Sequence, residues 1–248
     1  MERRTPSISV IIPVFNGAAF LAEAMASIRA QQIPVSEIIV VDDGSTDETA
    51  AVVAVLGKDI RYVYQTNQGP HAAQNTGLAL ARGNVIAFLD ADDRWTADKL
   101  NVQLPLLLSD LHPEVVLGFL QYIRLRKTAA GKCGYQPFLE PFFGANCFGA
   151  ALFRREAFAH VGLLDNAMIC GGDVDWFLRA REQGLVMAAV DRITLFYRLH
   201  PGNLTRHKTQ RDHFLLQALK QSLDRRRAAH GEVTDLGELP RPWPDMRK

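Results

Sequence analysis

Three features are scarce in this 248-residue sequence, and each scarcity excludes a class of protein. The only cysteines are Cys133, Cys147 and Cys170, widely spaced and without a Cys-x-x-Cys pair. This argues against a disulfide framework and a zinc site, and it fits a reducing compartment. No run approaches the roughly 20 apolar residues of a membrane span, and the first residues do not resemble a signal peptide. The formal net charge of +1 gives no reason to expect a nucleic-acid partner. We therefore expect a cytoplasmic protein.

The first hundred residues alternate between strand-like and helix-like segments. Short β-branched or apolar runs predict strands, and apolar residues at helical spacing predict the helices between them. The predicted strands are residues 8–12 (ended by Pro13), 37–41, 60–64 and 85–89, and the predicted helices are residues 20–31, 48–56 and 71–81. Alternation with short connections predicts an α/β fold with a doubly wound, mostly parallel central sheet flanked by helices.

Two of these strands end in acidic residues. Residues 85–89 lead into Asp90, Asp92 and Asp93, and residues 37–41 lead into Asp42 and Asp43. Open α/β sheets place their ligands at the carboxyl ends of the strands, so both clusters are expected at one edge. Clustered carboxylates favour a hard divalent cation, Mg²⁺ or Mn²⁺, which usually also holds substrate phosphates. The alternative is a solvated turn in which Asp93 caps a helix.

The second half is less regular. We expect helices at residues 97–109, 154–160, 173–183 and 207–230, strands at 115–126, 147–153, 186–190 and 193–199, and loops at 128–135 and 137–146. The last helix is predicted to be amphipathic, with Leu215 or Leu216, Leu219 and Leu223 on one side. Three arginines at 225–227 allow peripheral contact with an anionic membrane at the inner face or with another subunit. The alternative is a solvated helix end.

Four motifs carry a family resemblance. They are Val-Ile-Ile-Pro-Val-Phe-Asn at 10–16, Val-Asp-Asp-Gly-Ser-Thr-Asp at 41–47, Asn-Gln-Gly through Asn-Thr-Gly at 67–77, and Phe-Leu-Asp-Ala-Asp-Asp at 88–93. In order and spacing the sequence resembles the family 2 glycosyltransferases, which have the GT-A fold. The resemblance implies a single GT-A-like domain with a nucleotide-sugar half at about 7–93, an acceptor half at about 94–206, a C-terminal helix at about 207–230 and a tail at 231–248.

The resemblance also implies site residues. Positions 13, 15 and 43 would hold the base and ribose of a UDP- or dTDP-type donor, because a carboxylate accepts the imide N–H of a uracil or thymine ring and an aromatic ring packs on the base. Asp90 falls on the ribose side, and Asp92, next to Ala91, on the Mg²⁺ or Mn²⁺ ion. His200 is a further metal or diphosphate ligand. The implied nucleotide-site residues are Pro13, Phe15, Asn16, Asp43, Gln74, Asp90, Ala91 and Asp92. The alternatives are a core position for Phe15 and a His200 bonded within its own loop. For Asp42 we expect a structural role, either capping or bonding to the loop, and no ligand contact.

Two positions depart from the family pattern. Gln74 stands where the family usually has arginine, so either His71 or another basic group compensates or that arginine was structural. Gly172 stands where the family has the glutamate of a Glu-Asp pair, and Asp173 falls on the aspartate that acts as general base. One carboxylate suffices to deprotonate an acceptor hydroxyl, so Asp173 is the expected base. The alternative for Asp173 is a helix cap.

These features predict an inverting, metal-dependent glycosyltransferase that uses a nucleotide diphosphate sugar. Its acceptor would be a hydroxyl of a saccharide or a lipid-linked molecule, and the family resemblance alone implies a role in bacterial surface glycan biosynthesis. A sugar-nucleotide pyrophosphorylase would need a glycine-rich basic loop after the first strand, which residues 13–17 lack. The remaining alternative is a non-catalytic nucleotide-sugar-binding protein of the same fold, which the departures at Gln74 and Gly172 would favour.

Overall fold

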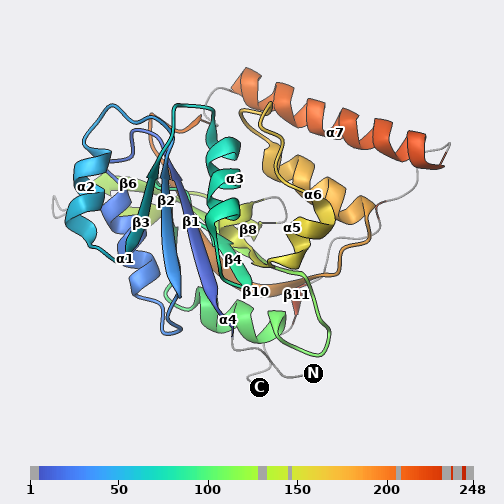
Figure 1. Ribbon diagram of the computed structural model, residues 1–248, viewed down its shortest axis with the longest axis horizontal. Coiled ribbons are helices and arrows are strands. Elements are labelled where there is room, and N and C mark those ends of the chain that lie inside the picture. Colours follow the sequence, from blue (N-terminus) through green and yellow to red (C-terminus); the bar gives the residue numbers. More distant parts are fainter. Residues whose placement is uncertain are drawn as a thin grey trace.

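One mixed β-sheet runs through the molecule (Figure 1). The computed structural model describes residues 6–127, 133–144, 147–204, 208–230, 236 and 242–243. In these residues the strands follow the order β11-β10-β6-β9-β4-β1-β2-β3, with β5 on β10 and with β7 and β8 on β6. The strands are β1 (Ile8–Val14), β2 (Glu37–Asp42), β3 (Ile60–Tyr64), β4 (Val85–Phe88), β5 (Arg94–Trp95), β6 (Val115–Lys127), β7 (Cys133–Pro137), β8 (Phe142–Phe143), β9 (Leu152–Arg154), β10 (Met187–Leu199) and β11 (Pro242–Trp243).

The central strands are parallel and covered by helices on both faces. β1 pairs in parallel with β2 and β4, and β2 pairs in parallel with β3. Helices α1 (Leu21–Arg29), α2 (Thr49–Leu56) and α4 (Lys99–Leu107) cover one face, and α3 (Pro70–Leu80), α5 (Glu156–Val161) and α6 (Gly172–Glu182) cover the other. The predicted doubly wound, mostly parallel α/β fold is confirmed.

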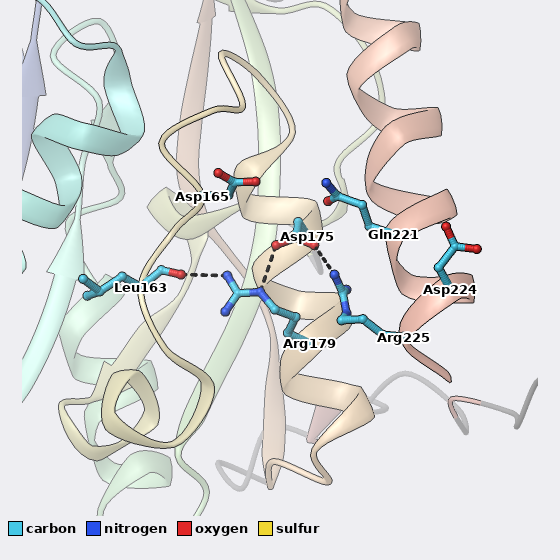
Figure 2. A pocket seen from close by; sticks show the side chains of 7 residues that line it. All are labelled: Leu163, Asp165, Asp175, Arg179, Gln221, Asp224 and Arg225. Atoms are coloured by element: carbon cyan, nitrogen blue, oxygen red, sulfur yellow. Dashed lines mark hydrogen bonds and ion pairs between the residues drawn. The ribbon is translucent and has the colours of Figure 1, made fainter. Parts of the chain in front are cut away.

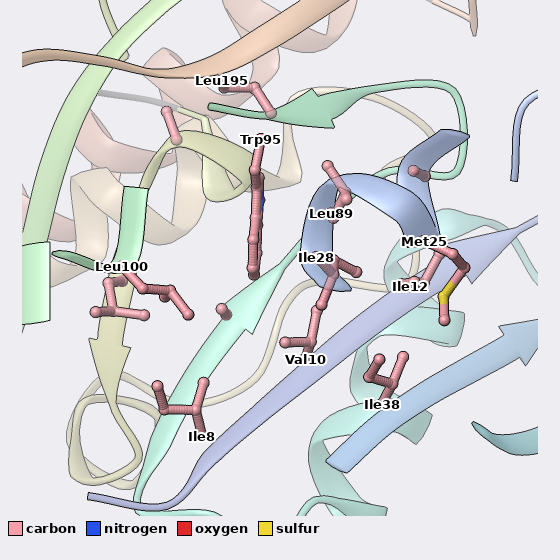
Figure 3. Close-up of a cluster of buried hydrophobic side chains, with 14 of the residues drawn as sticks. Ile8, Val10, Ile12, Met25, Ile28, Ile38, Leu89, Trp95, Leu100 and Leu195 are labelled. Atoms are coloured by element: carbon pink, nitrogen blue, oxygen red, sulfur yellow. The ribbon is translucent and has the colours of Figure 1, made fainter. Parts of the chain in front are cut away.

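Strand β1 explains the continuous apolar runs in the sequence. Val10 and Ile12 pack in one cluster with α1 and α4, whereas Ile11 packs in a second cluster with α3, α5 and α6. Successive side chains of a strand point to opposite faces, so a strand that is buried on both sides needs apolar residues at every position. Figure 3 shows the first cluster, in which Trp95 lies beside the strand residues.

The prediction that Pro13 ends the first strand is wrong. Pro13 lies inside β1 and is in register with Val41 of β2. In a parallel strand, alternate residues bond to opposite neighbours. The carbonyls of Ile11 and Val14 accept bonds from Leu89, after β4, and from Asp43, after β2, respectively. The missing N–H of Pro13 therefore faces the β4 side beyond the last paired residue, where no ladder bond is lost.

Two short antiparallel strands pair with β6 in the regions that the sequence predicted to be loops. Residues 133–137 form β7 and residues 142–143 form β8, both antiparallel to β6, while residues 128–132 and 145–146 lie outside the described part. The predicted strand at 147–153 is wrong, because residues 148–150 form a 3₁₀ turn before β9. The two predicted strands at 186–199 are one long strand, β10, with register shifts between Ala189 and Leu195.

Helix α7 (Lys208–His230) lies along α6 on the outside of the molecule (Figure 1). Its bounds agree with the prediction, but the leucine side does not form the contact. Leu215, Leu216 and Leu219 are 41%, 66% and 42% exposed, whereas Ala218 and Ser222 are buried. No helix in the described part of the chain has both the length and the apolar character needed to cross a bilayer.

Candidate active site

Four carboxylates come together beyond the carboxyl end of β4. Asp90, Asp92 and Asp93 form the turn that follows this strand, closed by a bond from the Asp93 N–H to the Asp90 carbonyl (3.0 Å). Asp173 comes from the first turn of α6, and its charge interacts with that of Asp90. The structure thus joins residues that are about eighty positions apart, as expected where α/β sheets place their ligands.

Asp92 is bonded to the loop that follows β10. The Nε2 atom of His200 lies 2.9 Å from Oδ2 of Asp92, and the Asn203 amide donates to the same oxygen at 3.2 Å. Asn203 also accepts from the His200 N–H (2.6 Å) and donates to the Arg198 carbonyl (3.0 Å). His200 therefore contacts both its own loop and Asp92, which brings the two predicted metal ligands side by side.

Asp93 is the structural member of the turn. It is buried, and its Oδ1 accepts the Arg198 N–H at 2.9 Å. The guanidinium of Arg198 is itself buried, reaches Glu23 at 3.0 Å, and lies over the rings of Phe20 and Tyr135. Asp93 therefore fastens the end of β10 to the acidic turn and does not cap a helix.

Asp173 is held by the main chain of the neighbouring 3₁₀ turn. Its Oδ2 accepts the Phe148 N–H at 3.0 Å. Because α6 begins at Gly172 and Gly171 precedes it without a side-chain cap, Asp173 is not the helix cap that the sequence allowed. Its charge acts on Asp90 of the acidic turn, while one of its oxygens is fixed by the Phe148 N–H.

The cluster carries excess negative charge. Burial raises the pKa of Asp93 and of Asp173, and for Asp93 the charges of Asp92 and Asp90 add to that rise. Asp90 has an exposed face, and its carboxylate accepts no hydrogen bond from the described residues. Desolvation by the surrounding protein nevertheless raises its pKa to about 8, and the charges of Asp92 and Asp173 add to the rise. Carboxylates that resist ionisation in this way favour a cation or a proton among them.

The turns after β1 and β2 are bonded to each other. Asn16 has a φ of +52°, and its side-chain oxygen accepts the N–H groups of Thr46 (2.8 Å) and Asp47 (3.3 Å), while its own N–H donates to Ser45 Oγ (2.8 Å). Phe15 is 54% exposed, which rules out the core position considered for it. Its ring is therefore free to pack against a ligand.

Asp43 anchors the loop that leads into α3. It is buried, and its carboxylate accepts three N–H bonds: Gln65 Nε2 (2.7 Å) and the Gln68 N–H (2.9 Å) at Oδ1, and the Gly69 N–H (2.8 Å) at Oδ2. A carboxylate offers about four acceptor positions, so one remains for a ligand. Asp42 bonds the Tyr62 hydroxyl (2.6 Å) and the Ser45 N–H (2.7 Å), which is the loop-bonding role considered for it.

The remaining predicted residues connect these parts. Pro13 and Ala91 are buried, and a Cβ added at Gly17 would lie 3.3 Å from the Cβ of Ala91. The turns after β1 and β4 are therefore in close contact. Gln74 is buried, and its Oε1 lies 2.9 Å from Nδ1 of His71, whose other ring nitrogen accepts the Gly172 N–H at 3.1 Å.

Sequence reasoning missed several residues of this region. Arg198 and Asn203 shape the loop of His200, and the centroid of the Phe20 ring lies 4.4 Å from that of the His200 ring. Cys147 lies close enough to the acids that burial and their charges raise the pKa of its thiol. The Pro-Gly-Asn turn at 201–203 signalled a turn but not its contact with Asp92. The other contacts join distant segments, so no local pattern could have revealed them.

A surface pocket of ≈ 460 Å³ lies elsewhere, between α6, α7 and the loop before α6 (Figure 2). Within it Asp175 bonds both Arg179 (2.9 Å) and Arg225 (2.9 Å), and Arg225 also bonds Glu182 (2.6 Å). None of its lining residues belongs to the acidic cluster. Asp175, Arg179 and Arg225 are held in ion pairs across it, so we interpret it as the seam that holds α7 on α6.

No group of three or more His, Cys, Asp or Glu side chains is arranged to hold a metal ion in the part of the chain that the structure describes. The donors nearest to one another are Asp92 and His200. Two protein ligands are few for a metal held by protein alone, but they suit a cation whose other ligands are substrate phosphates and water.

The fold and the acidic edge define a GT-A type α/β protein. Solved structures with this fold include TarS residues 1–349 of S. aureus in complex with UDP (TM-score 0.63, 17% identity, 90% of this chain and 73% of that chain). Another is the mannosyltransferase PcManGT of Pyrobaculum calidifontis in complex with GDP-Man and Mn²⁺ (TM-score 0.66, 19% identity, 90% and 65%).

The family follows from the sequence comparison. The sequence model of glycosyl transferase family 2 matches residues 9–162, so the chain belongs to this family. A relative, the putative teichuronic acid biosynthesis glycosyltransferase TuaG of Bacillus subtilis, is 38% identical over 112 residues, which are 44% of each protein. The chain spans less than half the length of the curated relatives it matches.

Proposed function

We propose that this chain transfers a sugar from a nucleotide diphosphate sugar to an acceptor hydroxyl, with inversion at the anomeric carbon. The observation that carries the proposal is the convergence of Asp90, Asp92 and Asp173 at the carboxyl end of the sheet in a family 2 chain. Residues to about 93 would bind the nucleotide sugar, and the residues after them would bind the acceptor.

The donor is proposed to carry a uracil or thymine base. The exposed ring of Phe15 and the remaining acceptor position of Asp43 lie on neighbouring turns, after β1 and β2. An aromatic ring and a carboxylate are the groups that pack on a pyrimidine and accept its imide N–H. TarS was solved with UDP, which supports this choice, whereas PcManGT was solved with GDP-Man. Binding of uracil and thymine nucleotides must therefore be compared with binding of guanine nucleotides.

Asp92 and His200 are the residues proposed to hold Mg²⁺ or Mn²⁺. Desolvation, with the charges of Asp92 and Asp173 added to it, raises the pKa of Asp90 and so supports a cation here. A carboxylate with one imidazole leaves positions for phosphate oxygens and water. When bound, the ion would neutralise the charge of the leaving diphosphate. Asn203, which donates to Asp92 and accepts from the His200 N–H, would keep the two ligands oriented.

Asp173 is proposed as the general base. Its carboxylate would take the proton of the acceptor hydroxyl while that oxygen forms a bond to the anomeric carbon. The bond between this carbon and the β-phosphate oxygen breaks, and its electron pair leaves with the nucleoside diphosphate. A single displacement of this kind inverts the anomeric centre. Burial raises the pKa of Asp173, which makes it a stronger base than an ordinary carboxylate.

The acceptor is proposed to be a saccharide or a lipid-linked saccharide of a bacterial surface glycan. The name of TuaG, a putative teichuronic acid biosynthesis glycosyltransferase, supports this class. The exposed leucines Leu215, Leu216 and Leu219 on α7 support peripheral contact with the cytoplasmic face of a membrane, where a lipid-linked acceptor would be reached. Vesicle flotation of the wild type and of Leu216→Glu tests this contact, which the substitution should weaken.

Donor binding tests the proposal. Melting temperatures are measured with UDP, dTDP, GDP and their sugars, with Mn²⁺, with Mg²⁺ or with EDTA. A ligand at 100 times its Kd adds about 2.7 kcal/mol of stability, or roughly 5–10 °C for a chain of this size. We expect a metal-dependent rise with uridine or thymidine nucleotides that Asp92→Asn abolishes and the control Asp59→Asn retains. The absence of a rise with every nucleotide contradicts the proposal.

A further inference from the structure

His71 bridges two helices beside the candidate base. It is the second residue of α3 and is only 5% exposed. Its Nε2 lies 3.1 Å from the Gly172 nitrogen, and its Nδ1 lies 2.9 Å from Gln74 Oε1. Because a backbone N–H can only donate, Nε2 must be the acceptor and carries no proton. The proton is therefore on Nδ1, which donates to Gln74, and the ring is neutral.

The bond to Gly172 fixes the start of α6. The first N–H groups of a helix have no partner within the helix, and Gly171 supplies no side-chain cap. The imidazole of His71 takes the place of that cap for the Gly172 N–H. The next residue is Asp173, whose side chain is bonded to the Phe148 N–H. His71 thus positions the backbone at Asp173, and the Phe148 N–H positions the Asp173 carboxylate.

The ring also explains both departures from the family pattern. A Cβ at Gly172 would lie 2.4 Å from Nε2 and 2.5 Å from Cδ2 of His71, so a glutamate at this position would collide with the ring. An arginine at position 74 has only donors and could not accept the Nδ1 proton. Gln74 and Gly172 therefore fit the same imidazole, one by accepting its proton and the other by leaving room for it.

We propose that His71 is a positioning residue for the transfer reaction, and that Gln74, His71 and Gly172 form one matched set that holds Asp173 in line with the acceptor hydroxyl. This inference rests on the proposed function, in which Asp173 takes the acceptor proton. His71 acts through the main chain of α6 and takes no proton itself.

Kinetics of nucleoside diphosphate release test the role. His71→Phe loses both ring bonds, whereas His71→Gln can still accept from Gly172 and donate to Gln74. His160→Phe, on the exposed side of α5, is the control. We expect His71→Phe to lower kcat by about thirtyfold while donor KM and Kd stay within about twofold, because positioning of the base affects the chemical step and not donor binding. His71→Gln should recover most of kcat. Equal losses in kcat and donor affinity, or no recovery with glutamine, overturn the proposal.

A double-mutant cycle tests the matched set. Gly172→Ala alone must displace the ring and should lower kcat by about tenfold or more, but in a His71→Ala background the same change should alter kcat by less than about twofold. Additive effects overturn the coupling between the two positions.

A spectroscopic arm does not depend on activity. Long-range ¹H–¹⁵N NMR of the wild type should show a His71 ring that is protonated on Nδ1 and unprotonated on Nε2. Gln74→Leu should change the ¹⁵N shifts of this ring. A ring protonated on Nε2 overturns the bridge even where transfer is observed. A wild type that has the expected tautomer but releases no nucleoside diphosphate from any donor instead refutes the proposed function.

Discussion

The loop that Asp43 anchors offers the sharpest test of how the nucleotide side of the site is built. The buried carboxylate accepts N–H bonds from Gln65, Gln68 and Gly69. A hydrogen bond to a charged group contributes about 1.5–3 kcal/mol. Asp43→Ala leaves three donors without their acceptor. If the loop relaxes and water replaces about half of the loss, the free energy of unfolding should fall by about 2–4.5 kcal/mol.

Asp43→Asn should cost less than Asp43→Ala. Its amide oxygen can keep the bonds from Gln65 and Gln68, while its NH₂ group faces the Gly69 N–H, so the expected loss is about 1–3 kcal/mol. Each kcal/mol lowers the melting temperature of a chain of this size by about 2–4 °C.

The melting temperatures of the three variants test the role of the Asp43 carboxylate in holding this loop. The predicted order is Asp43→Ala lowest, Asp43→Asn intermediate, and Asp59→Asn unchanged. Asp59 is the control because it pairs with Arg29 at the exposed surface, where ion pairs contribute little. The reasoning is refuted if Asp43→Ala melts within about 2 °C of the wild type.

Three further predictions follow from the charges. Because the pKa of Asp90 is raised in the folded state, its contribution to stability is present below the unfolded pKa and is lost as pH rises toward 8. In EDTA at pH 8, Asp90→Asn should therefore melt on the order of 2 °C above the wild type, with no difference at pH 4; a lower melting temperature at pH 8 contradicts this. Because the pKa of Asp173 is raised, its carboxylate should become protonated at a higher pH than an ordinary carboxylate does. As pH is lowered, kcat at saturating donor should therefore begin to fall at that higher pH; a flat profile down to pH 4.5 contradicts this. Arg225→Met removes the pairs with Asp175 and Glu182 and should cost about 1–3 kcal/mol and speed hydrogen exchange in α7; unchanged exchange contradicts the seam.

The alternating first half of the chain could be predicted because each element is specified locally. Residues 8–12 and 85–89 read as buried strands from their apolar runs alone, and the acids that follow residues 85–89 had to lie at the carboxyl end of the sheet. Pro13 was mistaken for a strand end because the sequence does not say which neighbour a given residue faces. Only the pairing of β1 with β2 and β4 shows that the missing N–H is harmless.

The antiparallel strands of the second half could not be predicted. Strand β9 is three residues long and is inserted between β4 and β6, so it is stabilised by partners distant in sequence and not by its own pattern. The contact face of helix α7 was predicted wrongly for a similar reason. Its leucines suggested an apolar contact face, but it docks through Ala218, Ser222 and the ion pairs of Arg225.

The candidate site shows the same division. Asp90, Asp92 and Asp173 were identified from motifs, but the hydrogen bond from the Gly172 N–H to His71 spans 101 positions. The sequence showed that Gln74 and Gly172 depart from the family pattern. It could not show that both departures serve one buried ring, because that requires the packing of α3 against α6.

If Asp173 deprotonates the acceptor hydroxyl that attacks a donor held at the acidic edge, replacing its carboxylate must slow turnover and leave donor binding intact. Nucleoside diphosphate release from a panel of nucleotide sugars is measured with Mn²⁺ and saccharide acceptors for the wild type and Asp173→Asn, alongside calorimetric donor binding. We expect the variant to bind the donor within about twofold of the wild type and to turn it over at least about a hundredfold more slowly. Wild-type turnover by Asp173→Asn, or no donor binding and no release by the wild type, contradicts it.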